Sequence, residues 1–263
     1  MILSWRKVRT LLAVSYAEMM QYRAELYLWA ISGIMPFVLM GLWMEASAET
    51  PMAITPVDFA RYFLAVFIVR QATMVWVVWE FEDDVVHGRL SFLLLHPLDP
   101  AWRFFLSHVA ERFARVPFLI ALTGLFFLLY PKAFWIPSAA DLALATAAIT
   151  VAFLLRFLMQ YAFAMIAFWS ERANAIEDLW FMLYLFLSGF IAPLDLFPPA
   201  VRHAAEWTPF PYMIYLPARL LTGQGSDGIG RGLIVITIWS IVFYIVYRIL
   251  WYRGLRHYSA MGA

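Results

Sequence analysis

The chain has 263 residues, of which 64% are hydrophobic, 18% aromatic and 14% charged. Soluble domains carry about 45–50% apolar and about 25% charged residues, so this composition excludes an ordinary soluble domain and predicts a membrane protein. The absence of cysteine excludes disulfides, thiolate metal sites and cysteine nucleophiles. A net charge of +1 gives no indication of nucleic-acid binding.

The first segment, residues 2–21, has apolar side chains at helical spacing and a positive cluster of Arg6, Lys7 and Arg9. This pattern predicts a helix within residues 1–22 that lies along the membrane surface. An extension of the first membrane span is the alternative. Because Glu18 and Glu25 follow the positive cluster where a signal peptide has an apolar core, we do not expect a cleaved signal.

Six apolar stretches follow, and a membrane span needs about 20 residues. Pro36 lies within the first of them, and Arg70 interrupts the second near its middle. We therefore predict an all-α fold, a polytopic membrane protein with six transmembrane helices in one domain, 1–263. The expected spans are residues 26–44, 62–79, 115–131, 142–169, 179–193 and 233–247.

Two connecting regions differ from ordinary loops. Residues 80–111 form the longest charged segment, and residues 194–230 are rich in proline and aromatic residues, which predicts short helices at the membrane interface. With the N-terminus inside, the inner segments hold twelve Lys and Arg residues and the outer segments five. Since positive residues stay in the cytoplasm, both termini and the 80–111 loop are expected there, and 194–230 outside.

The 80–111 loop begins with an acidic cluster at the start of a short helix, where carboxylates complement the helix dipole. An apolar surface follows, which is unexpected on a cytoplasmic loop unless a protein or the membrane covers it. This predicts a docking surface. An amphipathic interfacial helix without a partner is the alternative.

Two arginines lie within the expected spans, Arg70 and Arg156. A charge at membrane depth costs a few kcal/mol and tends to face a cavity or a partner. Trp180 and Tyr184 share one face of the expected fifth span by their spacing. These residues are candidates for a substrate path, and the arginines suggest an anionic or amphipathic cargo. Snorkelling, structural ion pairs and ordinary aromatic packing are the alternatives.

The sequence lacks the motifs of two common kinds of site. Neither Lys7 nor Lys132 lies in a P-loop frame, so the chain is not expected to bind and split ATP by that route. The five histidines show no metal-binding spacing. We therefore expect neither a P-loop nor a metal site in this chain.

Two segments together resemble the ABC-2 type transporter permeases. Residues 88–100, GRLSFLLLHPLDP, are similar to that family's "G-(K/R)-L…L-L-x-P-L-x-P" loop after the second span. Residues 188–198, SGFIAPLDLFP, followed by Pro209, Pro217 and Gly223, are similar to the family's fifth span and outer re-entrant region. The order of elements also fits over nearly the whole chain.

The resemblance implies a permease subunit of an ATP-driven exporter in the cell (inner) membrane, which would not be an enzyme itself and would hold no cofactor. It would pair with a second permease, identical or homologous, and with two cytoplasmic ATP-binding subunits, which would hold the ATP and Mg²⁺. The loop after the second span would carry a coupling helix, residues 1–22 a connecting helix, and spans two and five would meet their counterparts at the dimer centre.

On this resemblance the expected sites divide into three groups. The ATPase-docking residues would be Glu82, Asp83, Asp84, Val85, His87, Gly88, Arg89, Leu90, Leu93 and Leu94. The substrate path would include Arg70, Met74, Arg156, Trp180 and Tyr184. The outer gate would consist of Phe190, Ile191, Pro193, Phe197, Pro209 and Phe210.

A hypothesis from another class is an ion- or proton-coupled secondary carrier that uses Arg70. Against it, the clean spans contain no membrane-embedded acid, and the two halves of the sequence show no repeat. Transport driven by a proton gradient alone would favour this carrier.

Overall fold

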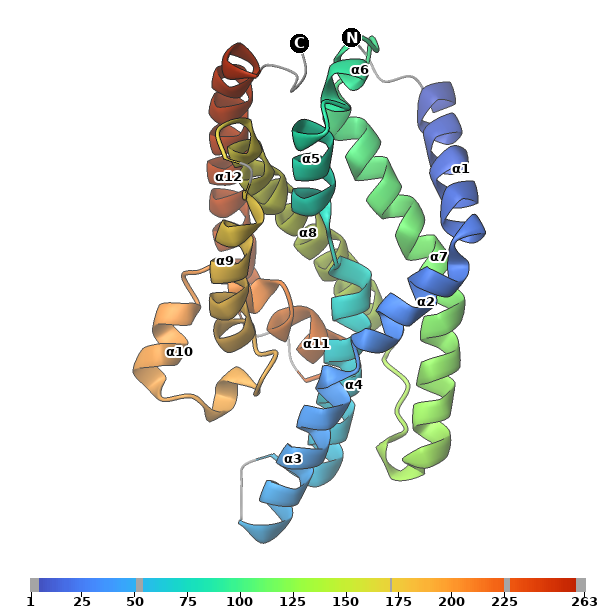
Figure 1. The fold of residues 1–263 in the computed structure, drawn as a ribbon. Coiled ribbons are helices and arrows are strands. Elements are labelled where there is room, and N and C mark those ends of the chain that lie inside the picture. Colours follow the sequence, from blue (N-terminus) through green and yellow to red (C-terminus); the bar gives the residue numbers. More distant parts are fainter. Residues whose placement is uncertain (1–4, 51–53, 171, 225–227, 259–263) are drawn as a thin grey trace.

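A computed structural model describes residues 5–50, 54–170, 172–224 and 228–258, which form helices joined by turns, without a strand in these ranges (Figure 1). The α-helices are α1 (Trp5–Gln21), α2 (Arg23–Ser32), α3 (Met35–Glu49), α4 (Pro56–Thr73), α5 (Val77–Val86), α6 (Leu90–Leu94), α7 (Pro100–Leu129), α8 (Ala139–Ala164), α9 (Asn174–Leu187), α10 (Pro199–Ala205), α11 (Tyr215–Leu221) and α12 (Ile229–His257). Short 3₁₀ helices are η1 (Pro131–Ala133), η2 (Met165–Phe168), η3 (Leu194–Leu196) and η4 (Phe210–Tyr212).

The described residues contain five helical segments long and apolar enough to cross a membrane: Arg23–Glu49, Pro56–Val86, Pro100–Leu129, Ala139–Phe168 and Ile229–His257. The predicted all-α polytopic architecture is confirmed. The expected fifth span, residues 179–193, lies earlier in the chain than predicted, because α9 begins at Asn174 and ends at Leu187; with 14 residues it is not among the five long segments. Gly189 follows with φ +83°, a left-handed conformation that suits glycine and turns the chain.

The first span consists of two helices, α2 and α3, with a break at Gly33 and Ile34. Pro36 lies in the first turn of α3, where its missing N–H would have no helical partner in any case. Pro36 therefore lies at the start of a new helix, just after the break. Gly33 accepts a hydrogen bond from Arg70 (3.2 Å), which ties the break to α4.

The third span begins earlier than predicted. Asp99 accepts a hydrogen bond from the N–H of Ala101 (2.9 Å), and Pro100 occupies the first helical turn, so these two residues start α7 well before Arg115. Pro117 lies inside α7 without ending it. Much of the predicted 80–111 loop is consequently helical, and the connection between α5 and α7 contains only the short α6 and its flanking turns.

The arrangement of the ends agrees with the predicted grouping of segments. In Figure 1 the start of α1, the end of α12 and α6 lie at one end of the molecule, whereas the ends of α3 and α7 and the helix α10 lie toward the other. We call these the inner end and the outer end. Helix α1 packs beside α7, and its position along a membrane surface stays a prediction.

The centre of the molecule is formed by α4, α5 and α11, which all pack against α8, and α11 also packs against α4. Helix α11 lies among the long helices in Figure 1, and its residues from Tyr215 to Ala218 are all buried. The expectation of short helices at the interface therefore fits α10 better than α11, which returns into the bundle. Helix α4 is enclosed by α3, α7, α8 and α11, so its side chains are mostly unavailable to a second protein chain.

Candidate functional site

The docking segment, residues 82–98, comprises the last turns of α5, the helix α6 and the chain up to α7. Gly88 has φ +71° and allows the sharp change of direction between α5 and α6. The segment therefore lies at the inner end of the molecule, at about the level of the end of α12 (Figure 1). All ten predicted docking residues lie on it, so the structure brings them together.

The charged residues of the docking segment are paired with one another. Arg89 donates to Asp84 (2.8 Å) and to Asp83, and His87 lies 2.9 Å from Asp83. The hydrogen bonds with Asp84 and Asp83 raise the pKa of Arg89 above its usual value. Glu82 accepts a hydrogen bond from the backbone N–H of Asn174 (2.8 Å) and so holds the start of α9. The acidic residues therefore form contacts within the chain. Asp83 is more accessible than Asp84.

Some apolar side chains of the segment are buried and others are exposed. Val85 and Leu90, both predicted to dock, are buried within the chain. Phe92 (68% exposed), Leu95 (82% exposed) and Leu94 face outward. Sequence reasoning missed Phe92 and Leu95, although their spacing of three residues on a short helix would have placed them on one face.

The second span contains a break that its apolar sequence did not predict. Helix α4 ends at Thr73 and α5 begins at Val77, so residues 74–76 are not helical. Arg112 of α7 donates to the carbonyl oxygens of Ala72 and Met74 (3.2 Å for Met74). The freed N–H of Trp76 donates to Nε2 of His108 (2.9 Å). Non-helical backbone is tolerated at membrane depth when the protein itself satisfies it, and α7 does so here.

His108 is held in one neutral form by its two contacts. Its Nε2 accepts from Trp76, so Nδ1 carries the proton and donates to the carbonyl oxygen of Phe104 (2.8 Å). His108, Arg112 and Arg115 are spaced by four and three residues on α7, which places them on one face. That spacing is the signal that could have identified this site from the sequence.

Arg70 and its neighbours form a polar layer next to this break. The guanidinium of Arg70 donates to Gly33 and lies 5.3 Å from the ring centroid of Phe190. Gln71 donates to Ala30 (2.9 Å) and accepts from Arg115 (2.9 Å). Arg70 therefore binds backbone and an aromatic ring, close to the predicted outer gate residue Phe190.

Arg156 has different contact partners from Arg70. It is 6% exposed, donates to the hydroxyl of Tyr184 (3.1 Å), and its guanidinium lies 4.7 Å from the centroid of that ring. Trp180 packs against Phe210, with ring centroids 4.8 Å apart. The predicted path residues Tyr184 and Trp180 thus serve as contacts of Arg156 and of the outer segment. Met74 belongs to the break and accepts from Arg112.

The outer segment, residues 188–224 and 228–231, is held by many contacts to itself and to the long helices. Tyr62 donates to the carbonyl oxygen of Gly189 (2.6 Å), and Trp43 donates to that of Ile191 (2.8 Å). The six predicted gate residues all lie in the packed part of this segment. The buried ones are Phe190, Pro193, Pro209 and Phe210, and the partly buried ones are Ile191 and Phe197.

A charged network covers the outer segment. Asp195 pairs with Arg202 (3.1 Å) and accepts from the hydroxyl of Tyr215 (2.7 Å), and Glu206 pairs with Arg202 (3.6 Å) and Arg231. Burial, followed by the hydrogen bond with Asp195, raises the pKa of Tyr215 to about 12. Tyr215 therefore stays neutral and donates to Asp195 at any physiological pH.

Metal-binding clusters are not found in the described part of the chain, where no three His, Asp or Glu side chains are grouped suitably for a metal ion. The described residues offer instead an exposed docking segment, a broken span held by α7, and a closed outer segment.

Comparison with known proteins agrees with this organisation. A family model described as ABC-2 family transporter protein matches residues 57–262. A comparison with curated proteins gave no match. The matched region covers the broken second span, the docking segment and the outer segment, and with the apolar helices it identifies a multi-pass membrane protein. The chain belongs to the ABC-2 type transporter permease family.

Proposed function

We propose that this chain is the transmembrane permease subunit of an ATP-driven exporter that works by alternating access. It would act with a second permease and with two cytoplasmic ATP-binding subunits, which hold ATP and Mg²⁺ and carry out hydrolysis. Membership of the ABC-2 family supports a permease of an ABC transporter. The observation that carries the proposal is the exposed apolar face of Phe92 and Leu95 at the inner end.

The docking segment fits an ATP-binding subunit because its exposed surface combines apolar side chains with a rim of paired charges. Large exposed apolar groups rimmed by polar residues are typical of protein interaction sites. Phe92 and Leu95 would supply the buried contacts, and Asp83, His87 and Arg89 would lie at the edge. Closure of the ATP-binding subunits would then move α5 through α6.

The second permease is proposed to cover α9. Leu179, Met182, Leu183 and Phe186 are exposed and recur on one face of this helix. Helix α4, which the resemblance placed at the dimer centre, is mostly enclosed within its own chain. The chain has no cysteine, so the variant Met182→Cys should form a disulfide only with a second copy. If oxidation of this variant gives no cross-linked dimer, the interface on α9 is contradicted.

Sidedness is proposed from the charge distribution, with both termini in the cytoplasm and the protein in the cell (inner) membrane. A cysteine introduced by Ile136→Cys, near the outer end, should react with a membrane-impermeant maleimide in intact cells. A cysteine introduced by Arg256→Cys, at the inner end of α12, should react only after the membrane is opened. Both positions are exposed and neither belongs to the docking segment, so accessibility from each side is the variable.

The main test is purification of the tagged chain from its native membrane. ATP-binding subunits should co-purify, and the complex in lipid should show ATP hydrolysis and ATP-dependent transport. Transport that continues without ATP and follows a proton gradient would instead support a secondary carrier that uses Arg70. Purified complex without any ATP-binding subunit would contradict the proposal.

A further inference from the structure

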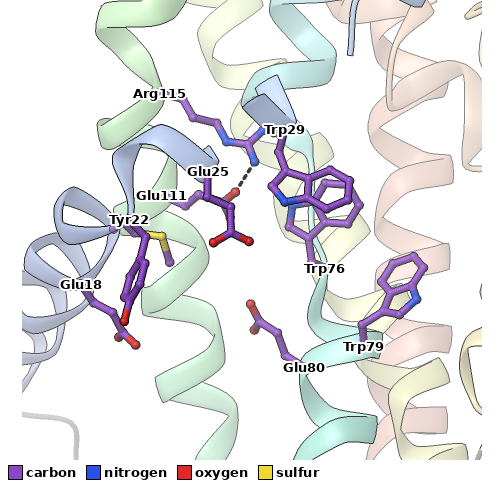
Figure 2. A pocket seen from close by; sticks show the side chains of 10 residues that line it. Glu18, Tyr22, Glu25, Trp29, Trp76, Trp79, Glu80, Glu111 and Arg115 are labelled. Carbon is purple, nitrogen blue, oxygen red and sulfur yellow. Dashed lines mark hydrogen bonds and ion pairs between the residues drawn. The ribbon is translucent and has the colours of Figure 1, made fainter. Parts of the chain in front are cut away.

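A cavity of about 750 Å³ lies at the inner half of the molecule, between α1, α2, α5 and α7. Figure 2 shows its walls, with tryptophan rings on one side, Tyr22 on the opposite side, and carboxylates from several helices around the space. Binding sites for small molecules commonly measure about 300–1,000 Å³. The lining residues are Glu18, Met19, Tyr22, Glu25, Trp29, Trp76, Trp79, Glu80, Glu111 and Arg115.

The charge around the cavity is negative and is not balanced from within. Arg115 is the cation in the lining, and it is 4% exposed, pairs with Glu111 and donates to Gln71. Its charge is therefore already matched. Glu18 and Glu25 form no ion pair with any described residue.

Glu80 has a histidine neighbour that does not neutralise it. His108 Nδ1 lies 3.9 Å from the Glu80 carboxylate, but this nitrogen donates to Phe104 while Nε2 accepts from Trp76. A histidine with one donor and one acceptor nitrogen is uncharged.

The cavity therefore holds the carboxylates of Glu18, Glu25 and Glu80, none of which forms an ion pair with a described Lys or Arg side chain. Arg103, which is not in the lining, acts on Glu80 from beyond ion-pair distance. Figure 2 shows Glu25 and Glu80 directed toward each other across the space. A cation placed between them would lie close to both carboxylates, whereas an anion would be repelled by them.

The aromatic wall favours the same class of ligand. Trp76 lies between Trp29 and Trp79, with ring centroids 6.1 Å and 5.8 Å away, and all three rings border the cavity. The face of a tryptophan ring attracts a cation, and also packs against an apolar body. The wall therefore suits a ligand that combines a positive charge with apolar groups.

We propose that this cavity binds an organic cation with an aromatic or apolar body, and that such compounds are the cargo class that enters from the inner half. The inference rests on the proposed exporter function for its biological meaning. From the sequence, Arg70 and Arg156 suggested an anionic or amphipathic cargo; the proposed ligand differs from the anionic alternative and is consistent with the amphipathic one. Those two arginines are instead engaged by Gly33 and Phe190 and by Tyr184.

The test uses two probes of the same shape and opposite charge, tetraphenylphosphonium and tetraphenylborate. The full chain is placed in nanodiscs of zwitterionic lipid without nucleotide, and binding is measured against empty nanodiscs. Tetraphenylphosphonium should bind saturably, whereas tetraphenylborate should not. Saturable binding of tetraphenylborate at the same site, or no saturable binding of tetraphenylphosphonium, would overturn the proposal.

Variants then assign the binding to the cavity. Glu25→Gln and Glu80→Gln should each weaken tetraphenylphosphonium binding about three- to tenfold, and Trp79→Leu about fivefold. Glu45→Gln and Trp207→Leu are matched controls, because both side chains are exposed and neither lines the cavity. Equal weakening by the controls would overturn the assignment.

This outcome is separable from the proposed function because probe binding needs neither ATP nor an ATP-binding subunit. Loss of probe binding beside intact ATP-dependent transport would remove only the cargo class. Intact probe binding in a chain that never associates with an ATP-binding subunit would remove only the exporter function.

Discussion

The two connecting regions of this permease, the inner docking segment and the outer segment, differ in how they satisfy their own side chains. The outer segment buries Phe190 and Phe210 and closes an ion-pair network around Asp195 and Glu206. The docking segment pairs its charges but leaves Phe92 and Leu95 in the open. A region that completes its own packing needs no partner, and a region that leaves large apolar side chains exposed is suited to receive one.

The largest effect is expected from a change that breaks the packing of the outer segment. Gly189→Ala should destabilise the permease by about 3 kcal/mol, because φ is +83° and the new Cβ would meet the Tyr62 hydroxyl at 2.6 Å and Tyr215 at 2.9 Å. Thermal denaturation in detergent would show a lower Tm. Gly41→Ala is the control, since no atom lies within 4 Å of its Cβ. An unchanged Tm for Gly189→Ala would show that the outer segment is not held tightly.

A somewhat smaller effect should follow at the docking segment, and on association instead of folding. Phe92→Ser with Leu95→Ser should weaken binding of the ATP-binding subunit by about 2 kcal/mol, roughly thirtyfold, because exposed side chains of this size act as central contacts in interfaces. The Tm of the isolated permease should stay the same. Ile136→Ser, at the outer end, controls for loss of an exposed apolar side chain. Undiminished binding would move the docking surface elsewhere.

The outer charge network should contribute less than the packing beneath it. Glu206→Gln removes the partner of Arg202 and Arg231, and both arginines are partly exposed. We expect a loss of about 0.5–1 kcal/mol, which decreases as salt is added because exposed ion pairs are screened. Tm measured at low and high salt tests this. A loss that is independent of salt would indicate a buried role for Glu206.

The smallest effect on folding is expected from Arg89→Gln. Arg89 and Asp83 are about half exposed, so their ion pair should leave the Tm essentially unchanged. The variant frees Asp83 and Asp84 from their partner, and ATP hydrolysis by the assembled complex reports whether these carboxylates contribute to docking. A large decrease in Tm would show that the pair holds α5 and α6 together.

The sequence predicts the apolar spans well because burial in lipid demands long runs of apolar residues, but it could not predict where those runs are interrupted. Residues 74–76 read Met-Val-Trp, without glycine or proline, and their hydrogen-bond partners His108 and Arg112 lie more than thirty residues later. The break depends on these tertiary contacts. Pro36, by contrast, is a local signal, and the first span is interrupted close to it.

At the docking segment the sequence predicted an apolar surface, but it did not show which apolar side chains lie on that surface. Val85 and Leu90 have the same chemical character as Leu94 and Leu95, yet the first two are buried and the last two exposed. Gly88 allows the turn between α5 and α6, Arg89 pairs with Asp84 beside this turn, and only the fold shows how these features combine. The same holds for α11, whose aromatic sequence suits an interface but which the fold encloses.

The break between α4 and α5 has a mechanical consequence. A continuous helix would transmit a displacement of α6 directly to the outer end. The three non-helical residues instead form a joint, which is held by hydrogen bonds to His108 and Arg112 of α7. We therefore expect α5 to swing as a short lever while α4 remains stationary among α3, α8 and α11. Such a joint would convert a small displacement of α6 into a change of width next to the tryptophan-lined cavity, while the packing of the outer segment stays unchanged.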